Sequence, residues 1–556
     1  MAARAEISNP PRRAGIGRLA GAAALIAVLT VASRIAGFGR TLVFVWGVGA
    51  TDLGDIYQAA NTVPNIIFEI VAGGALASLV VPLLAGAVAA GDRARVEATA
   101  SALLTWTLTL LIPLAVVVAL AARPIIEVLA PPGASPEQIA AGTRMLRIFA
   151  PQLPLYGVGI VLTGVLQAHH RFAWPVIAPL LSSITVIGTY LTFAATEGRG
   201  ADLPGVSVGG QLILAGGTTL GVAVLSLCLL IPLRRLHLRL RPTYRFSPEA
   251  RRAIGGLAAA GAVTVAAQQL ALLVVLKLAL AGPPGAVVLF TYAQAVFLLP
   301  WAVLAVPVAT AAYPTLSAAS AHGDEERYRV TLAPAVRAVL LLSCLGAAAL
   351  VTVARPAADL MVSADHAPAA AAGIAAFAPG LLGYGLFAVL SRALYARNEP
   401  RPAAAITAAG WAGVVVAALG LSRLLPAEDR VAALALGHSV GMTLLGGLLA
   451  VVVAHRAGRG ALTGFARAGV AGLVAAAISV GVGLAAGWLT LGSGTPTRGS
   501  ALVQGMLSGV VVLCVFLAVA YPLDRRDMHP MATALARRVS GALRQRVRTE
   551  RGTESR

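Results

Sequence analysis

The feature that most limits the fold of this chain is a long series of apolar runs, each about 20 residues or longer. A run of that length crosses a bilayer as a helix, because a backbone within lipid must satisfy its own hydrogen bonds. Hydrophobic residues make up 58% of the chain and charged residues 12%, whereas soluble domains average roughly 45–50% and 25%. We therefore predict an all-α polytopic membrane protein with helices near residues 19–48, 55–88, 101–122, 143–168, 174–195, 208–232, 253–281, 285–314, 332–354, 370–396, 402–422, 431–453, 463–490 and 501–522.

The positions of the arginines support an even number of spans. If the N-terminus lies inside, 31 arginines fall in predicted inside segments and six in predicted outside loops. Cytoplasmic loops carry such an excess of cations, and a shift by one helix would scramble the alternation. We expect about fourteen spans, with both termini cytoplasmic. The first run is also much longer than the 7–15 apolar residues of a cleaved signal peptide.

The net charge of +20 has an explanation that does not involve nucleic acid. The cations lie in loops and tails between apolar runs, where they fix topology and contact anionic lipid headgroups. No nucleic-acid partner is expected. The three cysteines, Cys228, Cys344 and Cys514, lie within apolar runs and match no metal-binding or disulfide spacing.

A weak internal repeat suggests how the helices are grouped. Prolines in similar contexts recur at offsets of 236, 232 and 227 residues: Pro64 with Pro300, Pro82 with Pro314, and Pro175 with Pro402. An offset of six helices preserves orientation, so we predict two six-helix lobes related by a pseudo-two-fold axis along the membrane normal. The expected division is a basic N-terminus (1–18), an N-lobe with a cationic cavity (19–232), a solvated basic linker (233–252), a C-lobe (253–453), two extra C-terminal helices (454–523) and a basic tail (524–556).

Two arginines in the first run are the leading candidates for function. An arginine at a helix centre costs about 2.5–3.5 kcal/mol on insertion scales, so it usually faces a cavity or a partner. Arg34 and Arg40 are six residues apart and would not share a face of a straight helix. Gly37 and Gly39 between them are candidate hinges that would let both side chains face one cavity. The alternative is that the two arginines extend to opposite interfaces.

The second run supplies the carboxylates. Asp52 is expected to cap its helix, and Asp55 to pair with an arginine of the first helix. Glu69 lies deep in the run, as a carrier of a proton or cation or as a structural ion pair with Arg34 or Arg40. Pro64 is a further candidate hinge.

Enzyme chemistry has little support in the sequence. No GxxxxGK[ST] motif occurs, and no nucleophile, base and orienting group stand together. We expect a transporter that needs neither a cofactor nor a metal.

Several segments resemble one known family. "SRIAGFGRTLVF", "VPNIIFEIVAGGALASLVVPLLA" and "YAQAVFLLPWAVLAVPVATAAYPTLS" are similar to the lipid II flippases of the MurJ (MviN) type, in the multidrug/oligosaccharidyl-lipid/polysaccharide exporter superfamily. The resemblance runs from about residue 20 to 520. It implies fourteen helices in the plasma membrane and a role in peptidoglycan synthesis, cell-wall biogenesis and cell shape. The implied activity moves an undecaprenyl-type lipid-linked precursor to the outer leaflet by alternating access, with Arg34, Arg40 and Asp55 contacting the substrate.

The chain also departs from the family pattern. Charged positions of the family fall at Phe68, Gly73, Ala295 and Leu298, while Glu69 stands where an arginine is frequent. These departures keep three alternatives open: an exporter of another lipid-linked glycan, a cation or drug antiporter, and a non-transporting scaffold for cell-wall synthesis proteins.

Overall fold

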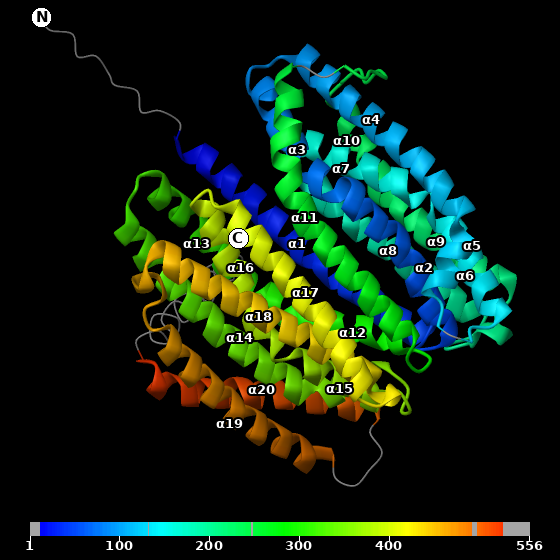
Figure 1. Cartoon of the computed structure of the whole chain (residues 1–556), viewed down its shortest axis with the longest axis vertical. Helices are drawn as coiled ribbons and strands as arrows, with labels where there is room; N and C mark the ends of the chain where they lie inside the picture. The colour runs from blue at the N-terminus through cyan, green and yellow to red at the C-terminus, as the bar shows by residue number, and fades with distance from the viewer. Residues whose placement is uncertain (1–11, 132, 246–247, 492–496, 526–556) are drawn as a thin grey trace, which may run out of the picture. The chain divides into compact units, whose positions relative to one another are not determined.

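The computed structural model describes residues 12–131, 133–245, 248–491 and 497–525 (Figure 1). Side chains are described in these ranges outside residues 12–27, 72–79, 248–262 and 490–491. Every regular element in the described ranges is a helix and none is a strand, which confirms the all-α class. Residues 526–556 of the predicted basic tail lie outside the described residues.

Twelve helices of the described chain are long and apolar enough to cross a membrane. The pair α15 (Ala367–Phe377) and α16 (Gly380–Ala396), bent by 43°, makes a thirteenth if it counts as one span. The predicted run 55–88 is not among them; it contains the π-helical segment Glu69–Gly73, and the side chains of residues 72–79 lie outside those described. The number fourteen therefore remains a prediction.

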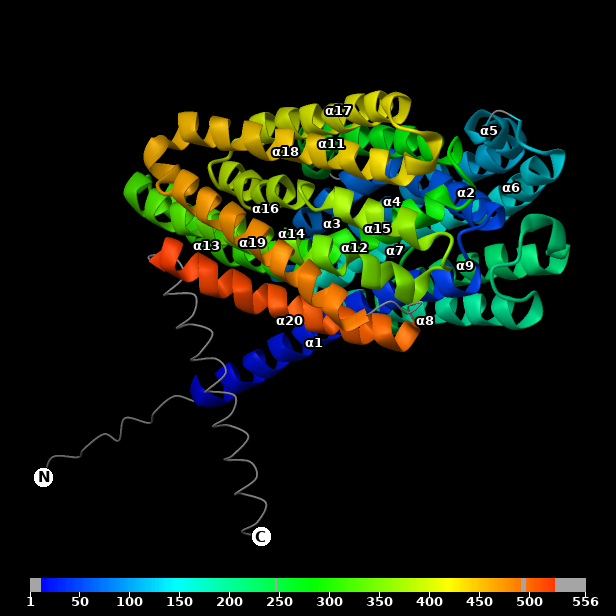
Figure 2. The same ribbon diagram turned by 90° about the horizontal axis from the view of Figure 1, so that it is seen from below.

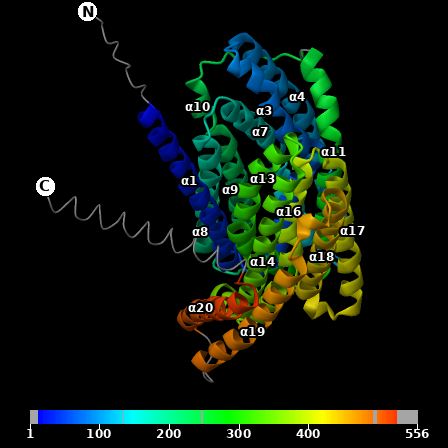
Figure 3. The same ribbon diagram turned by 90° about the vertical axis from the view of Figure 1, so that its left-hand side faces the viewer.

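The first of two compact units covers residues 1–262. Within it, α1 packs along α8, α8 along α9, and α7 against α3 and α4 (Figure 3). Its elements are α1 (Arg12–Gly47), α2 (Asp52–Phe68), the π-helix η1 (Glu69–Gly73), α3 (Gly74–Ala89), α4 (Arg93–Leu120), α5 (Ala122–Leu129), α6 (Pro136–Phe149), α7 (Gln152–Ala168), α8 (Ala173–Thr196), the 3₁₀ turn η2 (Leu203–Gly205), α9 (Val208–Leu227) and α10 (Leu230–Arg234).

The second unit covers residues 263–556, and α11 (Pro248–Leu280) contains the boundary. Here α18 packs on α15, α16 and α17, while α19 and α20 pack on each other and on α14 (Figure 2). Its other elements are α12 (Ala286–Pro300), the π-helix η3 (Trp301–Ala305), α13 (Val306–Ala321), α14 (Glu325–Met361), α17 (Pro400–Leu424), η4 (Ala427–Asp429), α18 (Arg430–Ala457), η5 (Arg459–Leu462), α19 (Phe465–Leu491) and α20 (Arg498–Leu523). A Cβ at Gly446 would lie 2.6 Å from the Gly383 Cα, so glycine is required where α16 and α18 cross.

The basic segment after α10 is attached to α4. Leu236, Leu238 and Leu240 pack against the core formed by α3, α4 and α7, while His237 and Arg239 between them are exposed. Three backbone N–H groups donate to side chains of α4: Arg239 to Glu97 (2.9 Å), Arg241 to Ser101 (3.0 Å) and Thr243 to Thr105 (3.1 Å). The donors are two residues apart in an extended segment, which corresponds to about 6.6 Å, and the acceptors are four residues apart in a helix, which corresponds to about 6 Å. The spacing of the donors therefore matches the spacing of the acceptors. Residues 236–245, here called the α4 strap, are therefore bound to α4, and the interpretation of this part as a solvated linker is wrong.

The two units repeat the same local features. In each, a helix containing a proline continues into a five-residue π-helix, η1 after Pro64 and η3 after Pro300, and the two π-helices begin 232 residues apart. A glycine with positive φ and a capping aspartate then start the next long helix, as Gly91–Asp92 and Gly323–Asp324. The structural offset agrees with the proline offsets in the sequence.

Most helices extend beyond the predicted apolar ranges. Helix α4 begins at Arg93 rather than 101, and α14 runs from Glu325 to Met361 rather than from 332 to 354. Apolarity marks only the part of a helix that lipid surrounds, whereas side-chain caps set the ends.

Candidate functional site

The two arginines of the first helix lie on one uninterrupted element. Helix α1 continues through Gly37 and Gly39, and both Arg34 and Arg40 are exposed in the described structure. Six residues along a continuous helix correspond to a rotation of about 600°, so the two side chains point about 120° apart. The structure does not bring them together, and the role of the glycines as hinges remains a prediction.

Arg40 faces a group of tyrosine hydroxyls from three other helices. It interacts electrostatically with Tyr57 of α2, Tyr156 of α7 and Tyr190 of α8. The Tyr57 hydroxyl lies 2.9 Å from the Tyr190 hydroxyl and 2.5 Å from Thr218 Oγ1 of α9. A guanidinium beside neutral hydroxyls keeps donors available for an anion.

Asp55 lies in the first turn of α2, two residues before Tyr57. Its side chain is buried, with 6% exposure. The cap of this helix is Thr51, whose side chain accepts from the Gly54 N–H at 3.3 Å. The expectation that Asp52 caps the helix is therefore wrong. Asp52 is the first helical residue instead, and its charge favours the helix N-terminus there.

Glu69 opens the π-helix η1 and is half-buried. The described structure gives it no ion pair with Arg34 or Arg40. It belongs to a polar stripe with Asn61 and Asn65, since residues four apart share a helix face. Asn65 bonds to the Tyr156 side chain, and Glu69 interacts electrostatically with the same hydroxyl. Asn61 Oδ1 is buried and accepts no hydrogen bond within the described residues.

Sequence reasoning missed the polar stripe and its partner on α7. The missed residues are Asn61, Asn65, Tyr156 and Gln152; the last is fully buried and donates from Nε2 to Thr219 at 3.2 Å. The spacing of Asn61, Asn65 and Glu69 would have revealed the stripe. Nothing in the sequence indicates that Tyr156 lies opposite.

The positions where family charges are missing have apolar roles. Phe68 is buried and packs on Tyr156, with ring centroids 5.3 Å apart. In the second unit, Leu298 helps to line a cavity of about 200 Å³ beside His438. The His438 ring is 5% exposed and is surrounded by aromatic rings with centroids 5.2–6.3 Å away: Phe297, Phe377, Tyr384 and Trp411. This cavity is lined by no carboxylate and no arginine among the described residues.

Comparisons with known proteins agree on one family. The family described as "Lipid II flippase MurJ" matches residues 46–521. A "Probable lipid II flippase MurJ" of Synechocystis is 28% identical over 41% of this chain and 43% of its own length. Another of Rhizobium meliloti is 26% identical over 60% of this chain and 61% of its own. The matched regions thus span less than two thirds of these relatives.

The fold also agrees with a solved structure. The structure "Lipid II flippase MurJ, inward closed conformation" aligns with a TM-score of 0.70 and 18% identity, over 90% of this chain and 99% of that one. At this identity the likeness concerns the fold. Together with the family match over most of the sequence, it establishes a multi-pass membrane protein, and the chain belongs to the lipid II flippase MurJ family.

Proposed function

We propose that this protein flips lipid-linked peptidoglycan precursor, lipid II, from the cytoplasmic to the outer leaflet of the plasma membrane. It works by alternating access, with both termini in the cytoplasm. Family membership supports the cargo, and the exposed arginines of the α4 strap support the orientation.

One observation supports the transport role most directly: Arg40 interacts with the hydroxyl groups of Tyr57, Tyr156 and Tyr190 within apolar helices. The pyrophosphate of the cargo carries concentrated negative charge, which a guanidinium binds through two parallel hydrogen bonds. We assign substrate contact to Arg34, Arg40 and Asp55. Rotation about Gly37 and Gly39 would bring Arg34 to the side of Arg40.

The first test is complementation in a strain depleted of the native protein, with an assay of which leaflet holds the precursor. Arg34→Ala and Arg40→Ala should insert normally but leave the precursor on the cytoplasmic side. Each substitution should reduce transport about tenfold or more, which corresponds to about 1.4 kcal/mol of lost anion binding in the transport step. Arg423→Ala, at an exposed arginine in the last turn of α17, is the matched control and should transport normally.

The outcomes separate the alternatives. A scaffold for cell-wall synthesis proteins would tolerate Arg34→Ala, so normal growth on that variant alone would contradict the proposal. An unchanged leaflet distribution after depletion would indicate another lipid-linked glycan as cargo.

The hinge assignment has its own variants. A Cβ at Gly37 or Gly39 would meet no atom within 4 Å, so alanine there fits without a clash. Loss of transport in Gly37→Ala with unchanged thermal stability would therefore report restricted backbone motion.

A second candidate function is favoured by Glu69. A half-buried carboxylate that forms no ion pair with the described side chains suits the exchange of a proton or cation, as in an antiporter. Glu69→Gln should then remove the dependence of transport on the ion gradient while leaving precursor binding intact. Unchanged coupling in this variant would assign Glu69 a structural role.

A further inference from the structure

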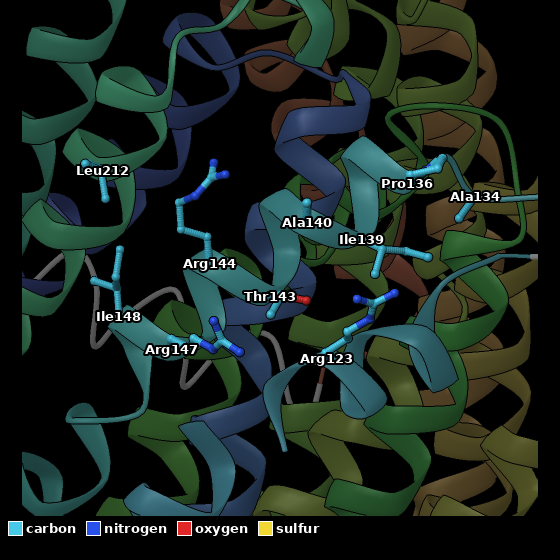
Figure 4. A pocket seen from close by; sticks show the side chains of 10 residues that line it. All are labelled: Arg123, Ala134, Pro136, Ile139, Ala140, Thr143, Arg144, Arg147, Ile148 and Leu212. Atoms are coloured by element: carbon cyan, nitrogen blue, oxygen red, sulfur yellow. The ribbon is translucent and has the colours of Figure 1, made fainter. Parts of the chain in front are cut away.

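A second basic site lies at one end of the first unit, and its lining includes none of the residues assigned above. Helices α5, α6 and α9 enclose a pocket of about 740 Å³ there (Figure 4). Three arginines line it: Arg123 of α5, and Arg144 and Arg147 of α6. The other walls include the apolar side chains of Ile139, Ile148 and Leu212.

The three guanidinium groups retain most of their donors. Arg123 uses Nε to pair with Glu127 at 2.8 Å, and Arg147 uses Nε for the Ala119 carbonyl at 3.4 Å. Arg144 donates from one Nη to Gln211. Each guanidinium carries five N–H groups, so the Nη groups of Arg123 and Arg147 remain available to an anion. Glu127 offsets only one of the three positive charges.

A buried hydroxyl in the same pocket lacks a hydrogen-bond partner. Thr143 is 7% exposed, and its Oγ1 forms no hydrogen bond within the described structure. Other helical threonines of this chain, such as Thr105 and Thr185, donate to the carbonyl four residues earlier. Thr143 shares a face of α6 with Arg147, and Figure 4 shows it between Arg147 and Arg123. An unpartnered buried hydroxyl costs about 1–3 kcal/mol, which a bound oxygen ligand would recover.

The pocket lies at the expected depth of lipid headgroups. The span that contains α6 has 33 residues, and Arg147 is 21 residues before its end at Ala168. About 20 residues cross the hydrocarbon core, so Arg147 falls at its edge. Leu120, the last residue of α4, and Val128 of α5 are 76% and 66% exposed, which is typical of a lipid-facing surface.

We propose that this pocket binds the phosphate-bearing headgroup of an anionic lipid. Guanidinium groups and a hydroxyl would bind the phosphate oxygens, while the acyl or prenyl chains lie against the exposed apolar residues. Two sources share this chemistry: a membrane phospholipid, and a polyprenyl diphosphate. The proposal does not depend on lipid II transport.

The test measures lipid retention by the purified full-length protein with native mass spectrometry. The probes are phosphatidylglycerol, phosphatidylcholine, a polyprenyl diphosphate and inorganic phosphate. The wild-type protein should retain an anionic lipid in preference to phosphatidylcholine. The double variant Arg123→Gln/Arg147→Gln should weaken that retention about tenfold, which corresponds to about 1.4 kcal/mol.

The matched control is Arg199→Gln, which removes one charge from a residue that stacks on Trp46 at 4.8 Å and does not line the pocket. It should retain lipid as the wild type does. Thr143→Val preserves shape and charge, and should weaken retention a few-fold without lowering the melting temperature. This variant keeps the test valid if the double variant does not fold.

Each outcome decides between the possibilities. If the double variant loses phosphatidylglycerol but retains the polyprenyl diphosphate, the site binds a phospholipid. If it loses the diphosphate but retains phosphatidylglycerol, the source is a polyprenyl lipid. Equal retention by wild type and double variant would overturn the proposal, as would equal binding of inorganic phosphate and lipid. Leaflet assays on the same variants distinguish this result from failure of the proposed transport function.

Discussion

At the scale of single residues, Tyr57 connects three helices of the first unit. Its hydroxyl contacts Tyr190 of α8 and Thr218 of α9, and its ring stacks on Phe44 of α1 with centroids 5.2 Å apart. The side chain is 1% exposed. This network holds the start of α2, and with it Asp55, in a fixed position relative to Arg40.

Replacing Tyr57 by phenylalanine should destabilise the protein. The change preserves the ring but leaves buried hydroxyls on Tyr190 and Thr218 without their shared partner, at a cost of about 1–3 kcal/mol. Thermal unfolding of the purified protein should show a lower melting temperature. Tyr313→Phe, at a 38% exposed tyrosine with no hydrogen bond in the described structure, is the control and should unfold as the wild type does. Equal melting temperatures for the two variants would contradict this role of Tyr57.

Only part of this residue-level arrangement follows from the sequence. Arg34, Arg40 and Glu69 are conspicuous because charge is rare in apolar runs. The contact of Tyr57 with Thr218 joins residues 161 positions apart. Hydroxyl residues are common in membrane helices, so nothing distinguishes this tyrosine or Thr143 from others. The sequence does not identify the cap at Asp52, because Thr51 one residue earlier is also a preferred capping residue.

At the scale of elements, the α4 strap attaches the basic segment after α10 to helix α4. Its hydrogen bonds to Ser101 and Thr105 use hydroxyls that a helix surface would otherwise present outward. The strap therefore holds its arginines on one exposed face, where anionic headgroups attract them.

The double variant Ser101→Ala/Thr105→Val should release the strap, because two backbone N–H groups lose their acceptors. We expect amide exchange of residues 239–243 to accelerate about tenfold, a loss of about 1.4 kcal/mol of local protection. Hydrogen exchange with mass spectrometry measures this directly. The control is Thr192→Val, whose hydroxyl bonds only to its own helix. Exchange at the strap that is unaffected by the double variant would show that the leucines alone hold it.

The paired π-helices form the second element-level feature. A π-helix contains one residue more than the regular helix that would replace it, since each bond spans five residues instead of four. Deletion of Val303, which is 68% exposed in η3, should restore a regular helix without loss of core contacts.

We expect the Val303 deletion to insert and melt close to the wild type, while transport falls about tenfold or more. The leaflet assay and thermal unfolding measure the two effects. Deletion of Val330, a 62% exposed residue in the regular helix α14, is the control. It rotates one half of that helix by about 100° relative to the other and should destabilise the protein strongly. Full transport by the Val303 deletion would remove any functional role of η3.

At the scale of the whole molecule, two connections of the first unit differ in charge. The strap and the neighbouring helix ends carry a series of exposed arginines, whereas the connection between α8 and α9 carries Glu197, Arg199 and Asp202. There, Ser207 donates to the Glu197 carboxylate from its hydroxyl at 2.6 Å and its N–H at 2.9 Å, which lowers the pKa of Glu197.

Cysteine labelling tests the resulting orientation. In a cysteine-free background, Asp202→Cys should react with a membrane-impermeant maleimide in intact spheroplasts. Arg245→Cys, in the strap, should react only after permeabilisation. The reverse pattern would place the N-terminus outside and contradict the proposed direction of transport.

The architecture was the most predictable part of the molecule. Apolar runs gave the helical class because bilayer thickness fixes their length, and the proline offsets indicated the repeat. The breaks were not predictable, because hydropathy does not distinguish π-helical from α-helical turns.

The π-helix η1 also has a mechanical consequence. The extra residue of a π-helical segment can shift along the helix axis while only the backbone hydrogen bonds next to it break and form again. When it passes a residue, that residue turns by about 100° and advances by about 1.5 Å. Glu69 is the first residue of η1. Displacement of η1 by one turn would therefore direct the Glu69 carboxylate toward a different neighbour while α2 and α3 remain folded.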